Sequence, residues 1–226
     1  MWNVKFYWSK YKNKHFDIYE NQIFSKQNGV MCMIIYATKQ TVDRYGMTMP
    51  ENFTDPIMKG VVQNTYDLEK DNSILEWGAK VFYFDGRKCI QVCNFASKLT
   101  FVLIDIKKSE LEIVGDLIAR YLLELYAGNK KMIKLLKRMF NEHPVCLFAK
   151  FTNKKIIASM NSFQLTYIDT GSIYYNSIEN GILKTIDINK KINKELYVAR
   201  YDVGGKKGYL FPADKFEELL IEYYSQ

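Results

Sequence analysis

Apolar residues alternate with more polar ones at the start of the chain and then form longer apolar runs. Val4, Phe6 and Trp8 alternate with polar or amphipathic neighbours, a KNK turn follows, and HFDIYE returns, so residues 1–30 are predicted to form an aromatic-rich hairpin. The continuous run VMCMIIYAT predicts a strand that is covered on both faces. A short helix is expected over 39–45 and a loop in MTMPENFTDPIMKG, while residues 60–75 fit irregular structure or a weak helix.

The stretch VFYFDGRKCIQVCN predicts a β-hairpin with a two-residue turn at Asp85 and Gly86. This turn would pair Phe82 with Cys89. LTFVLIDI then predicts a third apolar strand. Beyond it, Ser109 and Glu112 have the spacing of a capping box, and apolar residues at helical spacing follow as far as Gly128.

Asn129 is expected to cap a second helix over 130–141, which ends before Pro144. VCLFAKFT and IIASMNSFQLTYID are predicted to be strands around an NKK turn. After Gly171 come the strand-like runs SIYYNSI, ILKTIDI, ELYVARYDV and YLF, and then an amphipathic helix over 212–224.

Hairpins dominate this pattern, so we expect an α+β fold with a mostly antiparallel sheet and two central helices. The expected organisation is an N-terminal hairpin extension (1–30), a central α+β domain (31–171) and a C-terminal β-rich extension with a terminal helix (172–226). These parts are expected to form one compact unit.

Three stretches in the middle of the chain give it a family likeness. MIIYATKQTV, then WGAKVFYFDGRKCIQVCNFASKLTFVLIDIKKSEL, and later IASMNSFQLTY resemble an uncharacterised bacterial family whose shared region is a domain of unknown function. The resemblance covers roughly residues 33–168. It implies a shared fold and no activity, and it leaves residues 1–30 and 172–226 as additions.

Composition narrows the class of protein. No apolar run approaches the roughly 18–20 residues that cross a bilayer, and the N-terminus has no signal-peptide pattern, so we expect a cytoplasmic protein without a membrane partner. In that compartment the four cysteines are expected to be free thiols. The formal charge is +7, with a balance of +3 in residues 1–30, +4 in 31–171 and zero in 172–226.

The candidates for reactive chemistry are weak. Cys89 and Cys93 would stand about 13 Å apart on one face of a strand, too far to share a zinc ion, so they are interpreted as packing residues and no metal or cofactor is expected. A nucleophilic pair of His143 and Cys146 has no recognisable third group. GGKKG is followed by a strand-like run instead of the helix of a phosphate loop. We therefore predict no catalytic residues, although a dispersed active site stays open.

Two basic features indicate a docking surface. Lysines surround the apolar stripe of the predicted helix over 130–141, and aromatic residues interleave with lysines in residues 1–30. The first has a simpler interpretation as a solvated helix face, and the second as core packing; aromatic rings beside lysines also stack unpaired bases. The candidate binding residues are Lys130, Lys131, Lys134, Lys137 and Arg138 on the helix, and Trp8, Tyr7, Tyr11, Lys10 and Lys12 in the N-terminal segment.

The sequence thus favours a non-catalytic interaction protein that docks on a protein or ribonucleoprotein, such as an inhibitor or adaptor encoded on a mobile element. The alternative is an RNA-binding or single-strand-binding module, including a metal-independent nuclease. Only five of the 32 basic residues are arginine, which argues against base-specific reading by bidentate contacts.

Overall fold

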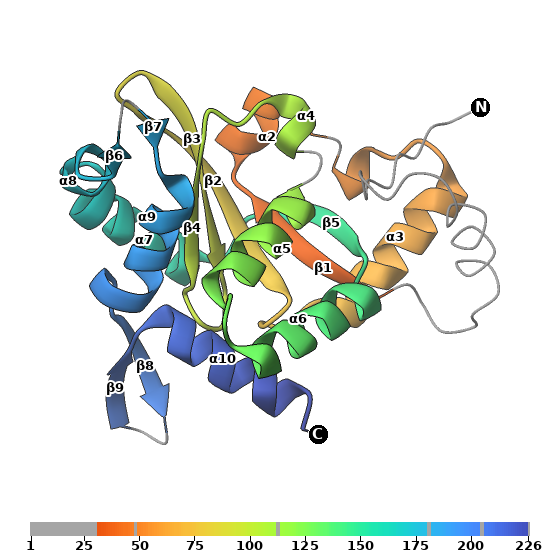
Figure 1. Ribbon diagram of the computed structural model, residues 1–226. Coiled ribbons are helices and arrows are strands. Elements are labelled where there is room, and N and C mark those ends of the chain that lie inside the picture. Colours follow the sequence, from red (N-terminus) through yellow and green to blue (C-terminus); the bar gives the residue numbers. More distant parts are fainter. Residues whose placement is uncertain (1–30, 48, 112–113, 180–181, 204–205, 226) are drawn as a thin grey trace, which may run out of the picture.

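The computed structural model of the protein describes residues 31–225, except 48, 112–113, 180–181 and 204–205 (Figure 1). The predicted hairpin over 1–30, with its five candidate binding residues, lies outside the described residues.

A five-stranded sheet forms the centre of the fold, in the order β4-β3-β2-β1-β5. Its strands are β1 (Cys32–Ala37), β2 (Glu76–Phe84), β3 (Arg87–Asn94), β4 (Thr100–Ile104) and β5 (Val145–Lys150). The β2–β3 and β3–β4 pairs are antiparallel, whereas β1 runs parallel to both β2 and β5. The α+β class is confirmed, but the sheet is mixed and not mostly antiparallel. The turn signals in the sequence predicted the antiparallel hairpins, whereas parallel pairing joins strands that are distant in the chain and leaves no local pattern.

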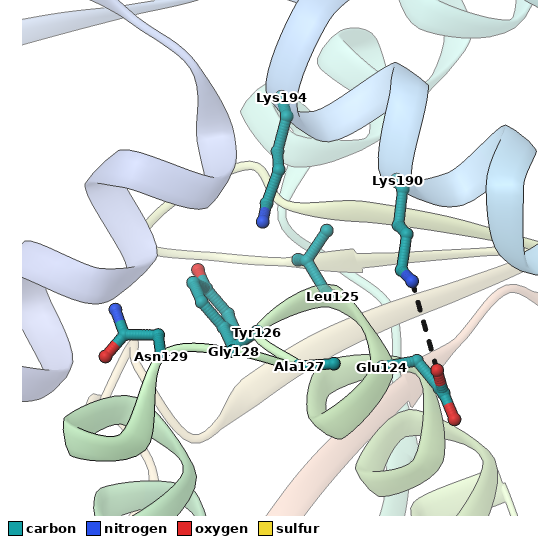
Figure 2. A pocket seen from close by; sticks show the side chains of 8 residues that line it. All are labelled: Glu124, Leu125, Tyr126, Ala127, Gly128, Asn129, Lys190 and Lys194. Carbon is teal, nitrogen blue, oxygen red and sulfur yellow. Dashed lines mark ion pairs between the residues drawn. The ribbon is translucent and has the colours of Figure 1, made fainter.

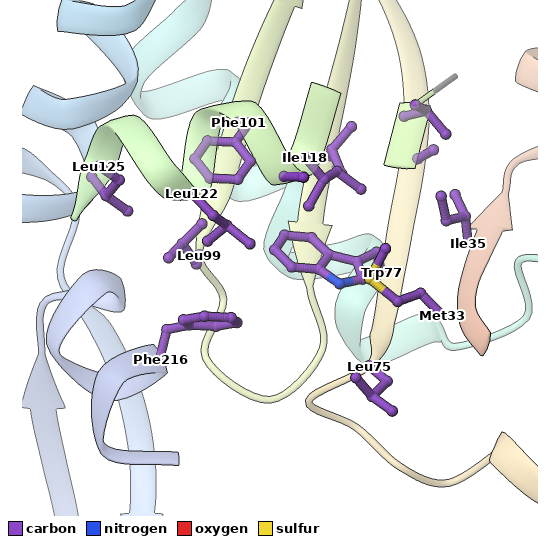
Figure 3. Packing of buried hydrophobic residues seen from close by; sticks show 14 of the residues in the cluster. Met33, Ile35, Leu75, Trp77, Leu99, Phe101, Ile118, Leu122, Leu125 and Phe216 are labelled. Carbon is purple, nitrogen blue, oxygen red and sulfur yellow. The ribbon is translucent and has the colours of Figure 1, made fainter. Parts of the chain in front are cut away.

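Helices cover both faces of this sheet. One face packs against the first group of helices, with Trp77 of β2 at the centre, stacked on Phe101 at 6.1 Å between ring centroids and flanked by Phe216 (Figure 3). These helices are α2 (Lys39–Tyr45), α5 (Val114–Leu125), α6 (Lys130–Glu142) and α10 (Pro212–Tyr223).

The opposite face holds two smaller apolar clusters, which receive side chains from the second group of helices. This group comprises α3 (Pro56–Glu69), α7 (Lys154–Phe163), the π-helix η2 (Gln164–Ile168), α8 (Ser172–Tyr175), α9 (Thr185–Lys191) and the π-helix η3 (Ile192–Leu196). The remaining elements are η1 (Pro50–Asn52), α4 (Lys108–Leu111), the pair β6 (Ile178–Glu179) and β7 (Ile182–Leu183), and the hairpin of β8 (Ala199–Val203) and β9 (Lys206–Leu210).

The predicted hairpin is confirmed in its register. Phe82 pairs with Cys89 across β2 and β3, and Asp85 and Gly86 both have positive φ, as the tight turn requires. All six residues of β1 are buried, in agreement with a strand covered on both faces. The helices α2, α6 and α10 also follow the sequence pattern, and Asn129 caps α6 by accepting a hydrogen bond from the Met132 amide.

The strand predictions after residue 153 are largely wrong. IIASMNSFQLTYID forms α7 and η2, because Asn153 caps a helix in which Ile156, Met160 and Phe163 lie on one buried face. SIYYNSI forms α8 and then β6. ILKTIDI supplies only two strand residues before α9 begins. β8 and β9 are found in ELYVARYDV and in the run before Phe211.

Among the described residues, no helix is long and apolar enough to span a membrane.

Candidate functional site

The lysine ridge, by which we mean Lys130, Lys131, Lys134 and Lys137, lies on the outer side of α6. The helix buries Met132, Leu136, Met139 and Phe140 in the core below the sheet. With that apolar face fixed, the four lysines project on the other side, and all four are exposed. Within the part of the chain that the structure describes, none of them makes an ion pair.

Three lysines of the ridge border a shallow depression. Lys130, Lys134 and Lys137 follow at i, i+4 and i+7, so their side chains stand in one row along α6. Together with Ile133 and Gly128 they line a hollow of about 430 Å³. Its floor is therefore partly apolar and its border is positive.

Arg138 does not act as a free member of this ridge. Its Nε lies 2.8 Å from Oε1 of Glu142, and its guanidinium stacks on the ring of Tyr224 at 4.3 Å. These contacts join α6 to the end of the C-terminal helix. The candidate surface thus consists of four free lysines and one arginine that is engaged within the protein.

A second depression continues the surface beyond the N-terminus of α6. Gly128, with φ 117°, lines both depressions and connects them. Figure 2 shows Lys190 reaching down from α9 to Glu124, and Lys194 reaching down from η3 toward Tyr126. The sequence could not place these two lysines beside the ridge, because they are more than fifty residues away from it in the chain.

The second depression carries both signs of charge. Lys190 lies 3.9 Å from Glu124, while the ammonium of Lys194 stands 5.6 Å from the centre of the buried Tyr126 ring. Asn129 also donates a hydrogen bond to Glu217 at 2.9 Å. Positive charge therefore dominates along α6 and becomes mixed at its N-terminal end.

The two cysteines of the hairpin are packing residues. Cys89 pairs with Phe82 and packs in the cluster with it, and Cys93 lies in the neighbouring cluster on the same face of the sheet. Burial, followed by the nearby Asp105 carboxylate, raises the pKa of Cys89 to about 11. Burial also raises the pKa of Cys93, so both thiols stay protonated at neutral pH.

His143 and Cys146 do not form an activated pair. The imidazole is buried, burial lowers its pKa, and its Nε2 faces the Tyr223 hydroxyl at 3.4 Å. The thiol packs against Gly115, and burial together with Asp116 raises its pKa to about 12. In the described structure no hydrogen bond joins the side chains of His143 and Cys146, because the imidazole faces Tyr223. The Cys146 thiol therefore stays protonated, and a protonated thiol is a poor nucleophile.

The GGKKG motif and a metal site were the other candidates for chemistry in the sequence. Lys206 and Lys207 of GGKKG begin β9, so this motif does not lead into a helix. Among the described residues, no group of three or more histidine, cysteine or acidic side chains is arranged to hold a metal ion.

Comparison with known protein families places most of the chain in a family. Residues 34–215 match the family described as Domain of unknown function (DUF6933). The match begins in β1 and ends in α10, so it includes nearly the whole central sheet and extends well past Ile168, where the resemblance was expected to end. No curated protein matches the chain. Since the matched region is more than half of its length, the protein belongs to the DUF6933 family.

Proposed function

We propose that the protein is a non-catalytic interaction protein, an inhibitor or adaptor that docks its lysine ridge on an acidic protein surface, either free or within a ribonucleoprotein. The observation that carries this proposal is the row of exposed lysines on α6, unpaired within the described residues, around a depression with Ile133 in its floor. A partly apolar hollow with a positive border suits an acidic partner that inserts an apolar side chain.

The rigid support of the ridge favours binding of a protein. The opposite side of α6 is anchored by Met132, Leu136 and Met139, each fully buried, so the spacing of the lysines is fixed by the core. A surface that is already ordered loses less conformational entropy when it binds. Long-range attraction by the ridge would also increase the rate at which an acidic partner associates.

The raised pKa values of the thiols and the burial of the imidazole support binding over nucleophilic catalysis. A cysteine nucleophile needs a thiolate, and burial raises the pKa of all four thiols. His143, with its lowered pKa, is neutral and enclosed in the core.

The charge pattern favours a protein over a single nucleic-acid strand. A nucleic-acid backbone follows a continuous positive groove with exposed aromatic platforms for its bases. Here the positive track is interrupted at Glu124, and the ring of Tyr126 is buried below Lys194. Both signs of charge at one end of the ridge suit a protein partner, which also carries both signs.

The test compares two full-length variants with the same change in charge. Lys130→Glu/Lys134→Glu/Lys137→Glu inverts the ridge, and Lys39→Glu/Lys154→Glu/Lys155→Glu inverts three exposed lysines on α2 and α7. Each is immobilised and exposed to host lysate with and without nuclease. We expect the wild type and the α2/α7 variant to retain the same protein, and the ridge variant to lose it.

Two results would contradict the proposal. The first is equal retention by the ridge variant. The second is loss of the partner after nuclease treatment, together with an affinity that falls at least a thousandfold between about 50 and 200 mM salt, which would favour the RNA-binding alternative.

A further inference from the structure

An exposed apolar stripe runs along α3. Ile57, Val61 and Leu68 are 77%, 48% and 71% exposed, and their spacing of four and seven residues places them on one face of the helix. A different face of α3 is buried through Val62 and Thr65, and the helix packs against β1. The stripe is therefore a second apolar face, separate from the one that attaches α3 to the sheet.

The chain enters the sheet beside this stripe. At the C-terminal end of α3, the carboxylate of Glu69 accepts a hydrogen bond from the backbone amide of Cys32, the first residue of β1. Leu68 precedes Glu69, and Met31, which precedes Cys32, is 46% exposed. Figure 1 shows α3 alongside the start of β1. Residues 1–30 thus join the described structure next to one end of the stripe.

The N-terminal segment is long enough to cover the stripe. An α-helix rises about 1.5 Å per residue, so the 14 residues of α3 extend about 21 Å. About seven residues of extended chain cover that length. The segment has 30 residues before Met31, several times this number.

The segment also has the complementary charge. Residues 1–30 carry five lysines and two acidic residues, whereas residues 50–71, which include α3, carry five acidic residues and two lysines. Its apolar residues also span a comparable length. Val4, Phe6 and Trp8 would span about 13 Å in an extended chain, and Ile57 and Leu68 lie about 16 Å apart along the axis of α3.

We propose that residues 1–30 of the same chain dock on the apolar stripe of α3, with Trp8 among the apolar residues that cover Ile57, Val61 and Leu68. The lysines of the segment then lie near the acidic residues that flank the helix. This assigns the N-terminal aromatic residues to an intramolecular contact. It does not depend on the lysine ridge or on any partner of the ridge.

Tryptophan fluorescence of the full-length protein tests this contact. Trp77 is fully buried, so after Trp2→Phe the only other tryptophan is Trp8. Acrylamide quenching then reports the accessibility of Trp8. We expect weak quenching in this Trp2→Phe background, and a severalfold rise in the quenching constant when Ile57→Ser, Val61→Ser and Leu68→Ser are added.

The matched control is Leu165→Ser, since Leu165 is 68% exposed on η2, a helix that packs mainly on α7 and α8. It should leave quenching of Trp8 unchanged, and circular dichroism should show both variants folded. The proposal is overturned if Trp8 is as accessible in the folded chain as in guanidinium, or if the triple serine variant does not change its quenching. If the protection of Trp8 from quenching disappeared on dilution, and ultracentrifugation showed a doubled mass, the stripe would be covered by a second copy of the chain. That result would also overturn the proposal.

Discussion

The side-chain amide of Asn193 pairs with the backbone of Thr100 as a neighbouring strand would. Its Oδ1 accepts the Thr100 N–H at 2.9 Å, and its Nδ2 donates to the Thr100 carbonyl at 2.7 Å. Asn189, one helical turn earlier, makes the same pair of bonds with Val102 at 2.8 and 3.1 Å. Four residues of helix rise about 6 Å and two residues of strand about 6.6 Å, so both asparagines reach β4. The edge of the sheet is closed by two side chains.

Asn193→Ala should destabilise the protein by about 2–3 kcal/mol, because it leaves the buried N–H and C=O of Thr100 without partners. The free energy of unfolding is measured by urea denaturation followed by circular dichroism. The control is Asn176→Ala, an exposed position where the change should stay within about 0.5 kcal/mol. Equal effects of the two substitutions would show that the amide pair contributes nothing to stability.

Gly78→Ala should also destabilise the protein, by about 1–3 kcal/mol, because a Cβ at this position in β2 would lie 2.5 Å from Cζ of Phe151. Phe151→Leu should recover part of this loss when the two changes are combined. In contrast, Gly60→Ala places a Cβ in open space within α3 and should stabilise the protein by about 0.5–1 kcal/mol. Thermal and urea unfolding of Gly78→Ala, Phe151→Leu, the double variant and Gly60→Ala measure these changes in stability. If Gly78→Ala left stability unchanged, the tight contact with Phe151 would be disproved.

All four cysteines should be unreactive in the folded protein, since burial raises each thiol pKa. A thiol reagent such as DTNB at about pH 8 should react slowly with the native protein and with four thiols after unfolding in guanidinium. Three of the thiols are buried and Cys146 is half-buried, so a thiol that reacts within seconds in the native state would contradict the raised pKa values.

Stability should fall at alkaline pH for the same reason. The pKa of Cys89 rises from its ordinary 9.0 to about 11 on folding, and that of Cys146 from 9.0 to about 12. Above pH 9 the unfolded chain releases these protons while the folded chain keeps them, so the contribution is full below pH 9 and is lost as the pH rises through 11 to 12. The urea midpoint should therefore be lower at about pH 10.5 than at pH 8, and Cys146→Ala should reduce this difference.

Arg138→Gln should affect partner binding less than Lys134→Gln, although each removes one positive charge. Arg138 is engaged with Glu142 and Tyr224, whereas Lys134 borders the depression on α6. Because the ion pair with Glu142 is exposed, its loss should lower folding stability only slightly. Binding titrations and thermal unfolding of both variants measure this. A larger loss of affinity from Arg138→Gln would place the docking surface nearer the C-terminal helix.

Local signals in the sequence predicted those parts of the fold that depend on neighbouring residues. The turn at Asp85 and Gly86 fixed the register of the hairpin, and Asn129 marked the start of α6. The same kind of signal was present for α7, where Asn153 is the cap and Ile156, Met160 and Phe163 have helical spacing. The stretch also contains several β-branched and aromatic residues, which favour a strand locally, but the cap and the buried helical face determine the observed structure.

The candidate site was predictable only as far as one helix extends. The lysine ridge lies on α6 alone, so its periodicity could be read directly. The approach of Lys190 and Lys194 to Gly128, and the engagement of Arg138 by Tyr224, depend on how distant segments pack. The pattern of a few neighbouring residues in the sequence does not predict contacts between distant segments.

The position of β1 between two parallel partners also affects how the chain is made. During synthesis Cys32–Ala37 leaves the ribosome before β2, and well before β5, which lies more than a hundred residues further along. Until both partners arrive, six apolar residues have unsatisfied backbone groups on either side. This strand is therefore prone to aggregation in nascent chains, and it is a segment that a chaperone for extended apolar chain would shield.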